Sequence, residues 1–394
     1  MIVLTERQLD HVRGALAFSG RISGKTHNFY HYPARFPPEL ARAVIGAFSR
    51  ANDWVLDPFM GGGTSIVEGL ALGRQMAGVD INALAHFVTT VRTTPLSEGD
   101  EKHVAEWAQR VSKATGRRMP CRRRPCEVRN LPRPIGLLLA RAKRLAKDLP
   151  TLTARSFATC ALLRLGQCAL DCRDTAAPRQ RPLSRQLPRL LNSMTQGLRE
   201  LALECRASGV RTREIRNRRI LLNRDAEGIG QEPALRPLLG RVKLVITSPP
   251  YPGVHVLYHR WQYRGRKETP APYWIASLPD GNGAAFYTLG SRTPTGIERY
   301  FGRLEVTFRS LIPLLDRTAV IAQLVAFADP ESQLQRYLGT MQEAGYIQLT
   351  DADRSIGELT RRVPNRKWYA RSKPNGRAAS ELLLLHTPRS NSLT

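Results

Sequence analysis

A short proline-rich segment after an apolar run has the residue types needed to hold an amine. Ser248, Pro249, Pro250 and Tyr251 directly follow the run Lys243–Thr247. Proline fixes φ and lacks a backbone N–H, so this turn presents carbonyl oxygens in a rigid arc. A neighbouring aromatic ring can stack on a flat base. An amino group that donates to the Ser248 hydroxyl and the Pro249 carbonyl would have its lone pair directed outward for attack on a methyl group. The alternative is a proline-rich loop without this role.

A second segment, Asp57 to Thr64, is typical of the way in which α/β proteins hold a nucleoside cofactor. An apolar run ends in an acid, glycines follow, and a helical pattern begins at Thr64. Ligands of such folds lie at the carboxyl ends of the strands, and glycine lets the backbone approach them without a Cβ clash. The next apolar run ends at Asp80, where a carboxylate can accept both hydroxyls of a ribose. Neither G-x-G-x-x-G nor the complete G-x-x-x-x-G-K-[ST] motif is present, which disfavours NAD and ATP.

In combination, these segments resemble the motifs of the S-adenosylmethionine-dependent amino-methyltransferases of DNA. That family has a cofactor motif D-P-F-x-G-x-G-T and a catalytic motif [DNS]-P-P-[YFW]. The resemblance extends to His31–Leu40, similar to the family's lead-in that lines the pocket for the methionine part, and to Asn223–Ala226, similar to its acidic turn. It implies S-adenosyl-L-methionine as the cofactor. The residues expected to bind it are Asp57, Pro58, Phe59, Gly61, Gly63, Thr64, Asp80, Asp225, Pro33 and Phe36.

The resemblance also implies the reaction. Ser248, Pro249, Pro250 and Tyr251 would be the catalytic residues, with Asp80 on the cofactor's ribose and Asp225 as a partner for its adenine amino group. A serine in the first motif position is typical of enzymes that make N4-methylcytosine, whereas D-P-P-Y and N-P-P-[YF] favour N6-methyladenine. The target base would be flipped out of double-stranded DNA. No metal and no covalent intermediate are expected.

The elements that must position these residues alternate between strand and helix. Strands are expected at 54–59, 75–79, 219–223, 243–246 and 318–325, with helices from 64 to 72, from 82, and around 297–315. A final edge or hairpin strand is expected at 381–386. This order predicts an α/β fold, a Rossmann-like methyltransferase sheet with helices on both faces.

The region between the two motifs differs in character. Residues 95–217 show Leu/Ala periodicity and arginine-rich runs, and the sequence therefore divides into 1–94, 95–217 and 218–394. The first and third parts would form the catalytic domain. The motif order resembles the family arrangement in which a target-recognition region lies between the two halves, so 95–217 is the candidate reader of the target. The alternative is that 95–217 is a helical insert with another function.

The charge of the chain predicts a polyanionic partner. Sixty Lys plus Arg residues face 33 Asp plus Glu residues among 394, a net charge of +27. Each phosphate that such a protein neutralises releases condensed counterions. The arginines of 117–124 could contact phosphates or form a solvated loop, and 254–261 could flank the flipped base or form a packing helix. An arginine bias of the genome is the other explanation of the charge.

The remaining features of the sequence concern the cellular location, the cysteines and the partners. There is no apolar run long enough to span a membrane and no secretory signal, so we expect a cytoplasmic protein. The six cysteines do not have zinc-site spacing and are expected to be structural. A cognate restriction endonuclease is a possible partner, and the sequence gives no oligomeric state. The rival interpretations are an RNA methyltransferase acting on the guanine amino group, and a DNA-binding protein that has lost catalysis.

Overall fold

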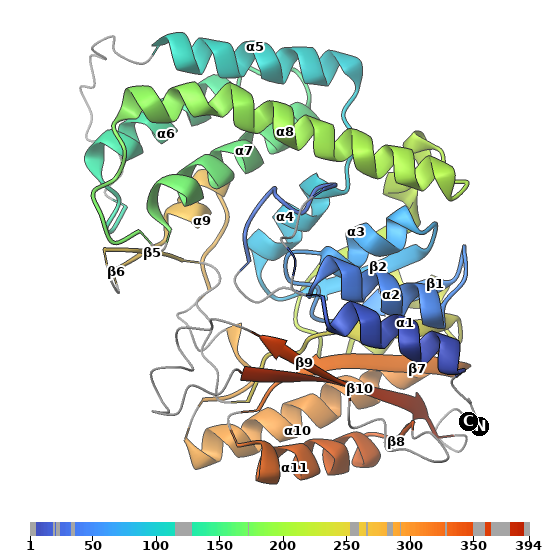
Figure 1. Ribbon diagram of the computed structural model, residues 1–394. Helices are drawn as coiled ribbons and strands as arrows, with labels where there is room; N and C mark the ends of the chain where they lie inside the picture. The colour runs from blue at the N-terminus through green and yellow to red at the C-terminus, as the bar shows by residue number, and fades with distance from the viewer. Residues whose placement is uncertain are drawn as a thin grey trace.

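The computed structural model describes most of the chain. The described residues are 5–18, 20, 24–32, 36–114, 128–171, 173–252, 260–264, 267–281, 287–291, 293–327, 329–349, 359–363 and 379–389. Figure 1 shows a sheet layer with helices on both sides and, above it, a region built from helices. None of the helices in the described ranges is long and apolar enough to cross a membrane.

The core of the fold is an eight-stranded, mostly parallel sheet. Its strands run in the order β3-β2-β1-β4-β7-β10-β8, and β9 pairs with β10. The strands β3, β2, β1, β4 and β7 are parallel to one another, whereas β10 is antiparallel to β7, β8 and β9. The strands are β1 (Trp54–Asp57), β2 (Gln75–Asp80), β3 (Arg219–Asn223), β4 (Val242–Thr247), β7 (Leu315–Val325), β8 (Tyr346–Gln348), β9 (Thr360–Val363) and β10 (Ala379–Pro388).

Helices cover both faces of this sheet because alternate residues of a strand point to opposite sides. Val55, Leu244 and Ile246 belong to a core with α1 (Glu6–Leu16), α2 (Pro38–Phe48) and α3 (Thr64–Ala71). Leu56 and Val245 belong to a second core with α10 (Pro294–Leu311) and α11 (Pro330–Glu343). Strands buried on both faces are read as continuous apolar runs, which is why the sequence revealed them.

The strand order reverses direction between β1 and β4. From β1 the chain continues to β2 and β3 on one side, whereas β4 and β7 lie on the other side. In open α/β sheets, ligands bind at the carboxyl ends of the strands beside this switch point. The two segments singled out in the sequence follow β1 and β4, and they therefore leave the sheet at neighbouring positions.

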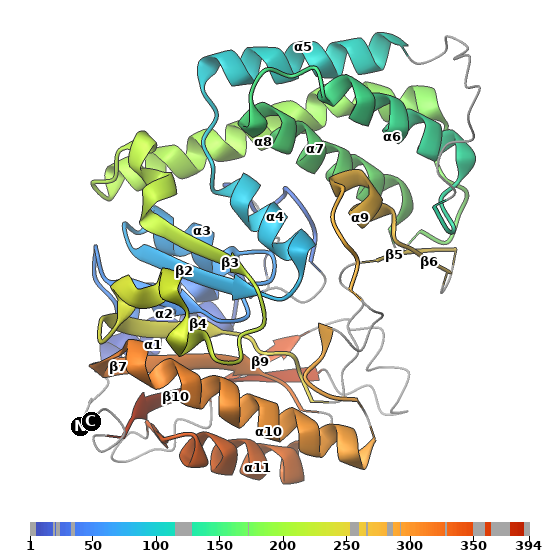
Figure 2. The same cartoon turned by 180° about the vertical axis from the view of Figure 1, so that it is seen from behind.

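The helical region occupies the chain between the two halves of the sheet. It contains α5 (Glu98–Ala114), α6 (Arg133–Ala146), α7 (Leu152–Leu170) and α8 (Gln180–Ala207), and α4 (Ala83–Arg92) leads into it. The hairpin of β5 (Trp261–Tyr263) and β6 (Lys267–Thr269) and the helix α9 (Ala271–Ala276) return to pack on it (Figure 2). Short 3-10 turns complete the list, at Thr212–Arg218 (η1), Ile229–Gln231 (η2), Pro233–Leu238 (η3) and Ile312–Leu314 (η5).

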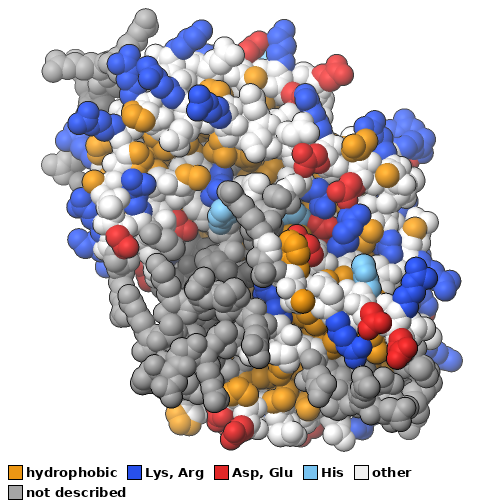
Figure 3. Space-filling view, viewed as in Figure 1, with side chains coloured by type: hydrophobic (Ala, Val, Ile, Leu, Met, Phe, Trp, Pro, Cys, Tyr) orange, Lys and Arg blue, Asp and Glu red, His pale blue; other side chains and the backbone are white. Residues whose placement is uncertain are grey.

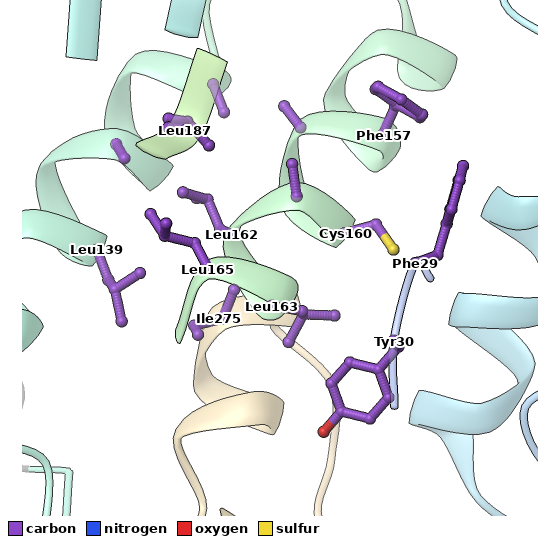
Figure 4. Close-up of a cluster of buried hydrophobic side chains, with 14 of the residues drawn as sticks. Phe29, Tyr30, Leu139, Phe157, Cys160, Leu162, Leu163, Leu165, Leu187 and Ile275 are labelled. Carbon is purple, nitrogen blue, oxygen red and sulfur yellow. The ribbon is translucent and has the colours of Figure 1, made fainter. Parts of the chain in front are cut away.

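A third hydrophobic core joins this region to the N-terminal half. Figure 4 shows Phe29 and Tyr30 against Phe157 and Cys160 of α7. The Phe29 and Phe157 rings meet edge to face at 5.7 Å, and the Tyr30 hydroxyl accepts a hydrogen bond of 2.9 Å from the indole N–H of Trp261. The helical region is thus packed onto the segment that leads to the sheet.

The α/β fold class is confirmed, with three differences in detail. The helix expected to end near 315 ends at Leu311, and β7 begins at Leu315 instead of 318. The strand expected at 381–386 as an edge or hairpin strand does pair antiparallel with the preceding β9, but it is not an edge strand, because β10 lies between β7 and β8 and Leu383, Leu384 and Leu385 are buried. Trp261, expected on a possible helix, belongs to β5, and residues 254–259 lie outside the described residues.

The cysteines do not form a cluster in the described part of the chain. Cys160 and Cys205 are buried, as expected for structural residues, but Cys168 is exposed. Cys121, Cys126 and Cys172, together with the arginines of 117–124, lie outside the described ranges. No group of three His, Cys, Asp or Glu side chains that could hold a metal ion occurs among the residues that were described.

Candidate functional site

The carboxylate of Asp57 joins the two predicted motifs. One oxygen accepts hydrogen bonds from the Thr247 hydroxyl at 2.8 Å and from the Phe59 N–H at 3.1 Å. The other oxygen accepts from the Ser65 hydroxyl in the first turn of α3. Burial raises the pKa of Asp57 to about 6, and these three donors limit the rise. The glycine loop after β1, the start of α3 and the end of β4 are therefore held by one side chain.

The glycine loop has a backbone that only glycine adopts readily. Gly61 and Gly63 have φ values of +49° and +73°, and Gly63 is the N-cap of α3. At Gly62, an added Cβ would lie 2.5 Å from a ring carbon of Tyr32. The loop thus packs closely on its surroundings, and Gly61 is its half-buried glycine.

Asp80 lies at the end of β2, opposite this loop. Its carboxylate accepts from the Gly61 N–H and the Asn82 N–H, each at 2.8 Å. Burial raises its pKa to about 6, and in the described structure no Lys or Arg side chain forms an ion pair with it. Each oxygen therefore keeps a lone pair for another donor.

A buried network, which the sequence did not indicate, supports the glycine loop from behind. Arg92 of α4 donates to the Gly62 carbonyl and, at 2.7 Å, to Nδ1 of His27. Nε2 of His27 lies 2.6 Å from a Glu68 carboxylate oxygen. Burial lowers the pKa of His27 to about 4, so the ring is neutral, and because arginine only donates, Nδ1 must accept while Nε2–H donates.

The Ser-Pro-Pro-Tyr turn is held by the C-terminal strand. The Tyr251 hydroxyl donates to a Glu381 oxygen on β10 at 3.0 Å, and Arg361 of β9 donates to the other oxygen at 2.7 Å. The Ser248 hydroxyl lies 3.4 Å from the Tyr251 hydroxyl. Pro249 is buried, whereas Ser248 and Pro250 are half-buried. Glu381 and Arg361 were missed because only a contact between distant strands gives them a role.

The acidic turn after β3 lies beside Asp80. The Arg224 N–H donates to the Asp80 carbonyl at 3.1 Å, and this places the turn next to the loop. Asp225 forms an ion pair with Arg303 of α10 and accepts from the Glu227 N–H at 3.0 Å. Its carboxylate is 34% exposed, so one side of it still faces solvent.

The other predicted residues differ in their surroundings. Phe36 is buried in the core under α1 and α2, and Pro58 is buried beside Asp57. Phe59 is half-buried, and the buried Thr64 hydroxyl has no hydrogen-bond partner within the described structure. Pro33 lies outside the described residues. The structure thus brings together the ends of β1, β2 and β4, and it places Phe36 in a hydrophobic core.

Comparison with known proteins agrees with this arrangement for the N-terminal part. Residues 15–88 match the model of the DNA methylase family that covers N6 and N4 methyltransferases. The type II methyltransferase M.MvaI of Kocuria varians is 42% identical over 74 residues, which is 18% of this chain and 16% of that protein. The type II methyltransferase M1.MboII of Moraxella bovis is 41% identical over 63 residues, which is 16% of this chain and 24% of that protein. The chain thus spans less than a quarter of the length of these relatives.

The rRNA methyltransferase aviRa of Streptomyces viridochromogenes aligns over 79% of this chain and 80% of its own, with 10% identity and a TM-score of 0.28. A score this low carries no argument about function.

The packing of the glycine loop predicts the effect of one methyl group. We expect Gly62→Ala to lower the free energy of unfolding by about 1–3 kcal/mol, because the Cβ must displace the Tyr32 ring. Gly46→Ala in α2 is the control, since nothing lies within 4 Å of its Cβ, and it should stabilise by about 0.5–1 kcal/mol. Urea unfolding of both variants measures the difference. Equal effects would contradict the close contact.

Proposed function

We propose that this chain, whose residues 15–88 belong to the DNA methylase family, transfers a methyl group to an exocyclic amino nitrogen of a base in DNA. We further propose that the base is cytosine and that the product is N4-methylcytosine. The observation that carries the proposal is the 2.8 Å hydrogen bond between Thr247 and Asp57. It supports a single site in which a methyl donor and an amine acceptor meet.

The residues around Asp80 fit S-adenosyl-L-methionine. The half-buried carboxylate of Asp80 has lone pairs free to accept two ribose hydroxyls. Gly61, which has a positive φ and no side chain, lies next to this carboxylate. The solvent-facing side of Asp225 would accept from the adenine amino group. When bound, the cofactor supplies a methyl group on a positively charged sulfur, which makes the methyl carbon electrophilic.

The Ser-Pro-Pro-Tyr turn would orient the amine. An amino group has two N–H donors, and the Ser248 hydroxyl and the Pro249 carbonyl are two acceptors next to each other in the chain. Orientation of a nucleophile in this way, here with the lone pair toward the methyl carbon, can supply up to about 7–11 kcal/mol. Tyr251 is only 8% exposed and is anchored by Glu381, so its position is fixed before a base arrives.

The surface of the helical region supports a nucleic-acid substrate. Arg181, Arg185 and Arg189 of α8 are exposed and recur every fourth residue, so they form one stripe opposite the buried Leu183 and Leu187. Figure 3 shows Lys and Arg side chains over this upper part of the molecule. Such a stripe can follow phosphates, which position a protein on the duplex without reading its sequence. We propose that the region between the motifs binds the DNA around a flipped base.

The relatives are named type II methyltransferases, and we extend that setting to this chain as a proposal. A restriction endonuclease that cuts the same sequence would be its partner in the cell. The protein would then protect host DNA by marking its recognition site.

The test is transfer of a tritiated methyl group to duplex DNA and, in parallel, to tRNA. We expect incorporation into duplex DNA only, and N4-methylcytosine after digestion to nucleosides and mass spectrometry. Ser248→Ala and Tyr251→Ala should each lower the rate by 10²-fold or more, because catalysis by orientation is lost. Tyr251→Phe is the matched control, since it keeps the ring and loses the hydroxyl that contacts Glu381 and Ser248, and it should lower the rate less than Tyr251→Ala.

Three results would contradict parts of the proposal. N6-methyladenine as the product would replace cytosine by adenine as the target. Incorporation into tRNA alone would favour the RNA interpretation. Unchanged transfer by the Ser248→Ala and Tyr251→Ala variants would remove the assigned site.

The raised pKa of Asp80 predicts that cofactor binding depends on pH. The carboxyl group is protonated below about pH 6 and then cannot accept two hydroxyls, so affinity should rise through pH 6. Titration calorimetry should give a Kd about tenfold weaker at pH 5 than at pH 8. Without cofactor, the stability of the protein changes with pH in the opposite direction to the affinity. The free energy of unfolding should fall from pH 4 to 6, because the folded state retains protons that the unfolded state releases. In Asp80→Asn the fall should become smaller but persist, because the pKa of Asp57 is also raised to about 6. A cofactor Kd that depends on pH in Asp80→Asn as it does in the wild type would contradict the assignment.

A further inference from the structure

A pocket of about 530 Å³ lies at the outer edge of the sheet, away from the Asp57 site. It is formed by α4, η1 and β3, and it is lined by Arg213, Arg216, Asn217, Arg219, His86 and Thr90. Figure 2 shows β3 at this edge of the sheet, next to α4 and below α8. The lining side chains are basic or neutral, and none of them is acidic.

Two arginines of this pocket form no ion pair of their own within the described residues, although the pKa of Glu214 is lowered by its hydrogen bond to Arg211 and also by the charge of Arg213. Arg213 and Arg216 are exposed, and within the described ranges neither forms an ion pair with a carboxylate. Two other arginines near them are engaged: Arg211 pairs with Glu214, and Arg218 donates to the Asn52 amide oxygen at 2.8 Å. The positive charge that faces the pocket is therefore left for a ligand.

Arg219 gives the pocket a fixed wall. Its guanidinium donates to the Thr93 carbonyl, to the Thr90 carbonyl at 3.3 Å and to the Thr94 hydroxyl at 2.9 Å, at the C-terminal end of α4. Burial, and then the charge of Arg216, lowers the pKa of Arg219 to about 10. Two guanidinium groups are thus close enough to repel each other, and an anion between them would relieve that repulsion.

We propose that this pocket binds a backbone phosphate of the DNA at some distance from the target base. Arginine pairs with phosphate through parallel N–H donors, which makes it the common residue for this group. Arg219 begins β3 and Asn223 beside Asp80 ends it, four residue steps apart, a span of about 13 Å. The pocket thus lies at the opposite end of β3 from Asp80, and β2 and β1 separate β3 from β4, so the phosphate would lie outside the DNA segment next to the target base. The inference rests on the proposed function for the identity of the polyanion.

The experiment measures duplex binding and needs no methyl transfer. Fluorescence anisotropy of a labelled DNA duplex would be followed from 50 to 300 mM KCl for the wild type, the Arg213→Ala/Arg216→Ala variant and the Arg211→Ala control. The double variant should bind about tenfold more weakly at 50 mM, and the slope of log Kd against log salt should fall by about 0.9 for one lost phosphate contact. Arg211→Ala, on the same turn but already paired with Glu214, should match the wild type.

The outcomes separate this inference from the proposed function. An unchanged slope in a double variant that is folded by circular dichroism, an equal loss in Arg211→Ala, or no duplex binding by the wild type would each overturn it. A second pattern would also overturn it. If the slope is unchanged, and millimolar inorganic phosphate raises the melting temperature of the wild type but not of the double variant, the pocket binds a small anion and not DNA. A changed slope without methyl transfer to any DNA would support the pocket and refute the proposed function.

Discussion

The structure depends on one buried carboxylate at the point where the strand order reverses. Burying a charge is costly unless hydrogen bonds compensate for it, and Asp57 has three donors from three parts of the chain. Because Thr247 is one of them, the start of the Ser-Pro-Pro-Tyr turn is fixed to the glycine loop. The parallel pairing of β1 with β4 makes this contact possible across a long separation in sequence.

Each loop of the site is supported by elements from elsewhere in the chain. Arg92 and His27 hold the glycine loop from the side of α4, and Glu381 holds Tyr251 from β10. The core around Phe29 and Phe157 packs the helical region against the residues that follow His27 in the chain. Under the proposed function, the groups that bind DNA, cofactor and base are parts of one packed body, so their spacing is set before substrate arrives.

The sequence predicted the parts of this arrangement that have local signals. Apolar runs marked β1, β2, β3 and β4, and glycines marked the loop after Asp57, since these depend on neighbouring residues alone. The role of Glu381 could not be predicted, because a single acid ahead of a leucine run gives no sign of a tyrosine on another strand. The interior place of β10 was missed for a related reason: its cover by β8 and β9 is set by tertiary pairing. The arginine pocket likewise exists only once η1, α4 and β3 meet.

The central claim is that the loops after β1, β2 and β4 form one site for a methyl donor and an amine. A crystal structure of the protein with S-adenosylhomocysteine tests it most directly. The account predicts that the ribose hydroxyls lie on the Asp80 carboxylate and that the sulfur faces Ser248 and Pro249. A ligand bound elsewhere, with its sulfur directed away from Ser248, would contradict it.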